Sequence, residues 1–256
     1  MNDVVLEVSG LTKAFGGVHA INNLSFSTRR GEILGVIGPN GSGKTTLFNV
    51  ITGVIPATAG RVRFRGETIT GLSTDTISRR GLIRTFQSAT VFRNETVYEN
   101  IRRSSMFGCI GKPSWFFRPG VVANGQRRAK EIVAELLEFS GLTDVATTIA
   151  GTLPYGKQKI LGVVIALAQQ PTQLLMDEPA AGLNPTETVA MGALVAQIRD
   201  QRSIDVVLVE HDIKMVTSVC DQILALNYGK AIAIDVPEKI VRHPEVIDAY
   251  LGVDHE

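Results

Sequence analysis

The chain has 256 residues, a formal net charge of +1 at pH 7, 44% hydrophobic residues and two cysteines. This length suits one large domain or two small ones, and the balanced charge gives no support to a nucleic-acid-binding surface. Polar residues interrupt every apolar run well short of a membrane span, and the first residues lack the features of a signal peptide. Cys109 and Cys220 show no metal-binding spacing, so we expect reduced thiols in a cytoplasmic protein.

The N-terminal part is predicted to consist mainly of strands. Two of them cover Val4–Val8 and Val18–Ser27, on either side of a glycine turn. The apolar run Ile33–Ile37 is typical of a buried parallel strand, and Thr46–Ile51 is predicted to be a helix. In Arg61–Arg65, arginines alternate with apolar residues, so they share one face of a further strand.

The middle of the chain is less regular. A short helix over Asp75–Arg80 and a strand over Leu82–Phe86 are predicted first. From Ser104 to Pro119 the pattern dissolves into Gly, Ser and Pro among aromatic residues, which indicates a loop that is either packed under the fold or binding something. An amphipathic helix is then predicted over Asn124–Phe139.

The second half alternates between helices and strands. The predicted helices cover residues 157–169 and 185–202, and another helix is predicted to lead to the strand at 222. The predicted strands cover 173–177, 204–210 and 222–226, and two short helices, split at His243-Pro244, are predicted within 237–251. Alternation of this kind indicates an α/β fold with a mainly parallel sheet covered on both faces.

One stretch carries a complete nucleotide-binding motif. The pattern G-x-x-x-x-G-K-[ST] is matched at every fixed position by Gly38, Pro39, Asn40, Gly41, Ser42, Gly43, Lys44 and Thr45. Thr46 follows directly and is expected to belong to the same site. Because a strand turns through glycines into a helix N-terminus here, several backbone N–H groups point at one spot and favour an anion. Lys44 is expected to reach the outer phosphates of a nucleotide, and the Thr45 hydroxyl to ligate Mg²⁺.

Three further polar residues follow predicted strands. Asp177 and Glu178 end an apolar strand, and His211 follows another, so all three are expected at the carboxyl edge of the sheet, where open α/β folds bind ligands. Asp177 there can hold Mg²⁺ or its water, and Glu178 can take a proton from an attacking water. Gln87 also ends a predicted strand, and its amide is placed to meet both the Mg²⁺ and that water.

The order of these motifs resembles the nucleotide-binding subunit of an ABC transporter over essentially the whole chain. Several segments are similar to the LivG-type ATPase of bacterial branched-chain amino acid importers, namely Arg84-Thr85-Phe86-Gln87, Thr96-Val97-Tyr98-Glu99-Asn100-Ile101, Asp177-Glu178-Pro179-Ala180-Ala181-Gly182-Leu183-Asn184-Pro185 and the ending His243 to Gly252.

That resemblance implies roles for single residues. Phe15, which by itself suits either core packing or base stacking, would stack on adenine. Gln87 would sense Mg²⁺ and couple to the membrane subunit, Glu178 would be the catalytic base, and His211 would contact the γ-phosphate of ATP.

The resemblance also implies an assembly. Such subunits hydrolyse ATP as head-to-tail dimers on the cytoplasmic face of the bacterial inner membrane. They lie beneath two permease subunits, to which an extracellular solute-binding protein delivers the solute. It further implies an ATPase core with an antiparallel β-subdomain (residues 1–87 and 170–236), a helical subdomain (88–169) and a C-terminal helical extension (237–256).

The signature segment departs from the family pattern. The usual Leu-Ser-Gly-Gly-Gln stands here as Leu153, Pro154, Tyr155, Gly156 and Lys157. Pro154 has neither the hydroxyl nor the N–H that would meet the partner's γ-phosphate, and losing one charge-assisted hydrogen bond weakens a contact by roughly 10- to 150-fold. Because the chain's own phosphate loop is complete, we hypothesise a heterodimer with unequal sites, with a homodimer as the alternative.

Three other functions compete with this interpretation. An ABC protein of DNA repair or translation would carry a long coiled coil or a second ATPase domain. A module that binds ATP without hydrolysis would have no need of Glu178 and His211. A transporter with another cargo, such as urea, amides, aromatic acids or exported lipid, would share the same motifs, because this subunit does not touch the cargo.

Overall fold

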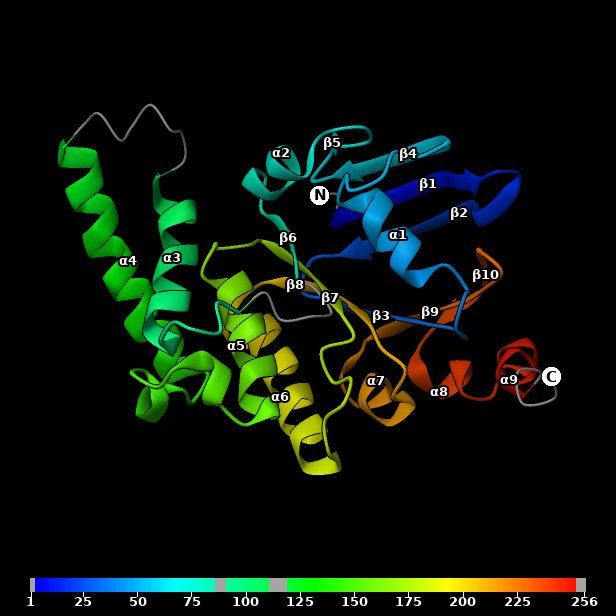
Figure 1. Cartoon of the computed structure of the whole chain (residues 1–256). Coiled ribbons are helices and arrows are strands. Elements are labelled where there is room, and N and C mark those ends of the chain that lie inside the picture. The colour runs from blue at the N-terminus through cyan, green and yellow to red at the C-terminus, as the bar shows by residue number, and fades with distance from the viewer. Residues whose placement is uncertain (1–2, 86–90, 111–118, 252–256) are drawn as a thin grey trace.

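A computed structural model describes residues 3–85, 91–110 and 119–251 of the chain. Within these residues the strands form a sheet of six and a sheet of four (Figure 1). The larger sheet has the order β10-β9-β3-β8-β7-β6, with bounds Lys230–Asp235, Gln222–Asn227, Ile33–Ile37, Asp205–Val209, Gln173–Asp177 and Leu82–Arg84. Its neighbouring strands are parallel, except that β10 runs antiparallel to β9.

Burial explains why the core strands were recognisable from the sequence. Every residue of β3, β7 and β8 is buried, as expected for continuous apolar strands covered on both faces. Strand β10 was not predicted, because at the edge of the sheet its residues stay exposed or half-buried and carry no apolar period.

The smaller sheet is antiparallel and has the order β2-β1-β4-β5. Its strands cover Val4–Phe15 (β1), Val18–Arg29 (β2), Ala59–Phe64 (β4) and Glu67–Thr68 (β5), so β1 is longer than predicted. Arg61 and Arg63 lie exposed on one face of β4, as the alternation predicted, while Val62 is buried on the other.

Helix α1 (Lys44–Ile51) lies between the two sheets (Figure 1). Its Leu47 and Phe48 are fully buried in a cluster with side chains of β1, β2, β3 and β4, so the helix that follows the phosphate loop is held from both sides. Helix α2 (Thr74–Arg79) follows the small sheet, and the Ser73 hydroxyl caps it by accepting the Thr76 N–H.

The helical side contains α3 (Val97–Ile110), α4 (Pro119–Phe139) and α5 (Tyr155–Leu167). The prediction of irregular structure from Ser104 is therefore wrong up to Ile110, and α4 begins earlier than predicted. Ser104 and Ser105 are polar residues at buried positions of α3, so they interrupted the helical period of apolar residues. Their burial is possible because their hydroxyls donate to the main-chain carbonyls of Ile165 at 2.6 Å and Arg102 at 2.8 Å. Trp115 and its neighbours in 111–118 lie outside the described residues.

Two 3-10 helices cover Thr143–Val145 and Ala150–Thr152. The remaining α-helices in the part of the chain that the structure describes are α6 (Pro185–Arg202), α7 (Ile213–Val219), α8 (Pro237–Ile240) and α9 (Pro244–Leu251). The predicted break at His243-Pro244 is confirmed. Helix α6 starts with a capping box, in which Asn184 Oδ1 accepts the Glu187 N–H at 3.0 Å and Glu187 Oε2 accepts the Asn184 N–H at 3.1 Å. No helix in the described ranges is long and apolar enough to cross a bilayer.

Helix α7 packs closely against β3. A Cβ atom added at Gly35 would lie 2.8 Å from Val216 Cγ1 and 2.9 Å from Cys220 Sγ, so only glycine allows this approach. Burial raises the pKa of the Cys220 thiol to about 12, and the thiol therefore stays protonated in the folded protein at neutral pH.

Candidate functional site

The phosphate loop connects the end of β3 to the start of α1. A Cβ atom at Gly38 would lie 2.2 Å from the Leu226 carbonyl oxygen, and one at Gly43 would lie 2.4 Å from the Ala20 carbonyl oxygen. Both positions also have positive φ, so a side chain is excluded by the backbone conformation as well as by the steric clash. No side chain caps the N-terminus of α1, which leaves its first N–H groups available for an anion.

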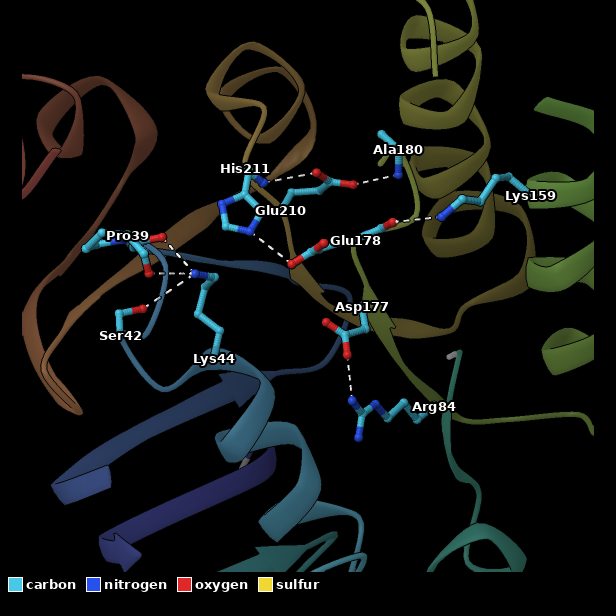
Figure 2. Close-up of polar contacts among 11 residues, drawn as sticks. Pro39, Ser42, Lys44, Arg84, Lys159, Asp177, Glu178, Ala180, Glu210 and His211 are labelled. Carbon is cyan, nitrogen blue, oxygen red and sulfur yellow. Dashed lines mark hydrogen bonds and ion pairs between the residues drawn. The ribbon is translucent and has the colours of Figure 1, made fainter. Parts of the chain in front are cut away.

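Lys44 folds back into this loop (Figure 2). Its buried ammonium donates to the carbonyl oxygens of Gly38 at 2.7 Å and Pro39 at 3.0 Å. Burial lowers the pKa of Lys44, and the carboxylates of Glu178 and Asp177 act in the opposite direction. The structure thus brings the predicted loop and the predicted acidic pair into one electrostatic site.

Asp177 ends β7 and is 2% exposed. Its Oδ2 accepts from Arg84 Nη2 at 2.5 Å, while its buried Oδ1 has no hydrogen-bond partner among the described residues. Arg84 Nη1 also donates to Asn49 Oδ1 at 2.6 Å. No role in the site was predicted for Arg84; an arginine closing an apolar strand beside the acidic strand is the signal that could have identified it.

Glu178 and His211 meet at the same sheet edge, as predicted. Glu178 Oε1 lies 2.9 Å from His211 Nε2 (Figure 2). A carboxylate in its ionised form can only accept, so the His211 tautomer that donates in this contact is the one with its proton on Nε2. Glu178 has a φ of 49°, a conformation that non-glycine residues rarely adopt and that functional sites often hold.

Glu210 is a second residue to which the sequence assigned no role. Its buried carboxylate accepts the N–H of Ala180 at 2.6 Å through Oε1 and the N–H of His211 at 3.0 Å through Oε2. Burial raises the pKa of Glu210, while these two N–H groups and that of Asp212 lower it. The carboxylate therefore joins the loop after Glu178 to the loop that carries His211.

The signature segment lies at the start of α5, on the helical side of the molecule (Figure 1). Leu153 and Gly156 are buried, Pro154 and Tyr155 are exposed, and Lys157 is half-buried. A Cβ atom at Gly156 would lie 2.4 Å from Glu187 Oε1, so the segment packs against the first turn of α6. The structure therefore places the signature segment at the start of α5 and the phosphate loop at the start of α1.

The other predicted residues are placed as follows. Phe15 closes β1 with its side chain 50% exposed, and Lys13 Nζ lies 4.8 Å from the ring centroid. Thr45 is exposed and Thr46 half-buried in the first turn of α1. Gln87 lies outside the described residues.

Comparisons with known proteins show which family the sequence resembles. The ABC transporter family model matches residues 21–181, and a model of branched-chain amino acid ATP-binding cassette transporters matches 232–256. The chain is 41% identical to the high-affinity branched-chain amino acid transport ATP-binding protein BraF of Pseudomonas aeruginosa and 39% identical to LivG of Escherichia coli K12. Both alignments cover 98% of this chain and 99% of the relative.

Solved structures show the same fold. A nucleotide-free ATP-binding cassette from an ABC transporter aligns with a TM-score of 0.81 and 29% identity, over 96% of this chain and 98% of that chain. A cassette in its ADP conformation aligns with a TM-score of 0.83 and 30% identity, over 97% and 99%.

The chain belongs to the ABC transporter family and is an ATP-binding cassette ATPase. Within that family it falls in the branch of BraF and LivG, which confirms the resemblance seen in its motifs.

Proposed function

We propose that this ATPase subunit powers the import of branched-chain or related amino acids. The supporting observations are its identity to BraF and LivG over nearly the whole chain and the match of its last residues, 232–256, to the branched-chain amino acid transporter model. Urea, amides, aromatic acids and exported lipid are the alternative cargoes.

The observation that carries hydrolysis is the contact of Glu178 with His211 beside Lys44. In the proposed mechanism, Lys44 and the N–H groups of the loop from Gly38 to Thr46 hold the phosphates of ATP, and Phe15 stacks on adenine. Glu178 takes the proton of the attacking water, and His211 holds that carboxylate and contacts the γ-phosphate.

The site also fits Mg²⁺. The buried Asp177 Oδ1, which has no hydrogen-bond partner in the described part of the chain, is a hard oxygen donor of the kind that Mg²⁺ takes, directly or through water. Thr45 and Gln87 would complete the protein's share of the ligands. When bound, Mg²⁺ neutralises negative charge on the outer phosphates.

The proposed assembly pairs this chain with a second cassette and two membrane permease subunits on the cytoplasmic face of the membrane, with an extracellular solute-binding protein acting through the permeases. In this assembly residues 1–87 and 170–236 form the ATPase core with its β-subdomain, 88–169 the helical subdomain and 237–256 the C-terminal extension. ATP binding closes the cassette dimer, and hydrolysis releases it.

The cargo is tested with the transporter reconstituted in proteoliposomes with its solute-binding protein. We expect ATP-dependent uptake of leucine, isoleucine and valine, and competition among the three. Uptake of urea, amides or aromatic acids without uptake of leucine would contradict the cargo, and ATP hydrolysis measured in the same vesicles would still report on the ATPase.

We also propose a heterodimer with unequal ATP sites, because Pro154 and Lys157 alter only the signature that this chain lends to its partner. The double substitution Pro154→Ser and Lys157→Gln restores a hydroxyl, an N–H and the amide of the usual signature. We expect a tighter contact, by roughly 10- to 150-fold, and a faster ATPase rate of the assembled transporter. An unchanged rate would contradict unequal sites; Lys130→Gln, on the exposed face of α4, controls for the loss of a lysine.

A further inference from the structure

Lys159 is a buried lysine in the second turn of α5, with 7% of its surface exposed. Burial of an ammonium group is costly unless hydrogen bonds compensate for the lost water. Lys159 Nζ donates to the main-chain carbonyl oxygen of Glu178 at 3.3 Å (Figure 2). The same ammonium lies 5.7 Å from the centroid of the Tyr155 ring. A buried cation from the helical side thus contacts the backbone of the residue proposed as the base.

The backbone of Glu178 is held from two sides. Its φ of 49° is unfavourable for a residue with a side chain, so neighbouring groups must maintain it. The Glu178 N–H donates to the Val209 carbonyl oxygen in β8 at 2.9 Å, and the Glu178 carbonyl accepts from Lys159 in α5. With both flanking peptide groups anchored, the direction in which the Glu178 side chain leaves the main chain is set toward His211.

A second contact joins α5 to the same loop. The Tyr155 hydroxyl donates to the carbonyl oxygen of Ala181 at 3.3 Å, and a Cβ atom at Gly182 would lie 3.1 Å from Cε1 of that ring. The loop after β7 therefore rests on two side chains of one helix, and Lys159 is the one that reaches Glu178 itself.

We propose that Lys159 is a positioning residue for ATP hydrolysis, which holds Glu178 in the backbone conformation that directs its carboxylate at the attacking water. This inference rests on the proposed role of Glu178 as the base. Lys159 does not contact the reacting atoms; its ammonium acts through the Glu178 carbonyl.

The test measures ATP hydrolysis by the full chain assembled with its membrane subunits. Lys159→Met keeps the length of the side chain and removes the donor. We expect kcat to fall by about 10- to 100-fold with the KM for ATP changed by less than about twofold, because a misaligned base affects the transition state and not ATP binding. Lys159→Arg keeps a cationic donor and should restore most of kcat.

Two further variants make the result decisive. Lys159→Gln is a second neutral variant, too short to reach the carbonyl, and Lys130→Met removes an exposed lysine of α4 as a control. Thermal unfolding of each variant separates folding from catalysis. A folded Lys159→Met or Lys159→Gln protein with normal kcat would overturn the inference, as would a rise in KM without a loss of kcat. If neither neutral variant folds, Lys159 serves the fold and the inference is wrong.

Glu178→Gln, assayed in parallel, distinguishes the two proposals. Continued hydrolysis in that variant would overturn the role of Glu178 and, with it, this inference. Loss of hydrolysis in Glu178→Gln together with normal kcat in Lys159→Met would overturn the role of Lys159 alone.

Discussion

Replacing Glu178→Gln is expected to lower the ATPase rate of the assembled transporter by about 10²- to 10⁴-fold, the contribution typical of a general base. The amide cannot take a proton from water, but it occupies the same volume and can still meet His211. ATP binding should persist, because Lys44 and the loop N–H groups are unchanged. The steady-state ATPase rate and the Kd for ATP are the quantities to measure.

The matched control is Glu131→Gln, the same chemical change on the exposed face of α4. It should leave both the rate and the Kd unchanged. Light scattering after size exclusion adds a second readout, since trapped ATP favours the closed cassette dimer. A Glu178→Gln protein that still hydrolyses ATP at the normal rate would exclude Glu178 as the base, whatever its oligomeric state.

Arg84→Met is expected to destabilise the fold by about 3–5 kcal/mol, the usual cost of removing one partner from a buried ion pair. The Arg84 and Asp177 side chains are 8% and 2% exposed, so solvent cannot replace the lost guanidinium. The free energy of unfolding, measured with urea in the absence of nucleotide, gives the magnitude.

Arg79→Met provides the control for this prediction. Arg79 pairs with Asp75 on the surface of α2, where the two side chains are 47% and 71% exposed, and such a pair contributes at most about 1 kcal/mol. Combining Arg84→Met with Asp177→Leu removes both buried charges and should recover part of the stability. Equal effects of Arg84→Met and Arg79→Met would show that the buried pair does not stabilise this site.

The sequence predicted those parts of the molecule that depend on short stretches of chain. The phosphate loop, the core strands and the C-terminal break at Pro244 were recognisable because glycine, apolar runs and proline restrict the local backbone. Helix α3 was not predicted, and Ser104 and Ser105 in its second half fill buried positions that a search for apolar periodicity expects to be apolar. Such serines are tolerated only because carbonyl acceptors lie within reach of their hydroxyls.

The sequence by itself also determined that Asp177, Glu178 and His211 would share one edge, because each follows a parallel strand. Which partners hold them was decided only by the tertiary structure. Arg84 and Asp177 are 93 positions apart, and the contact of Lys159 with Glu178 joins helix α5 to the residue that follows core strand β7. Such pairings depend on strand order and helix packing, whereas the motifs depend on the local backbone alone.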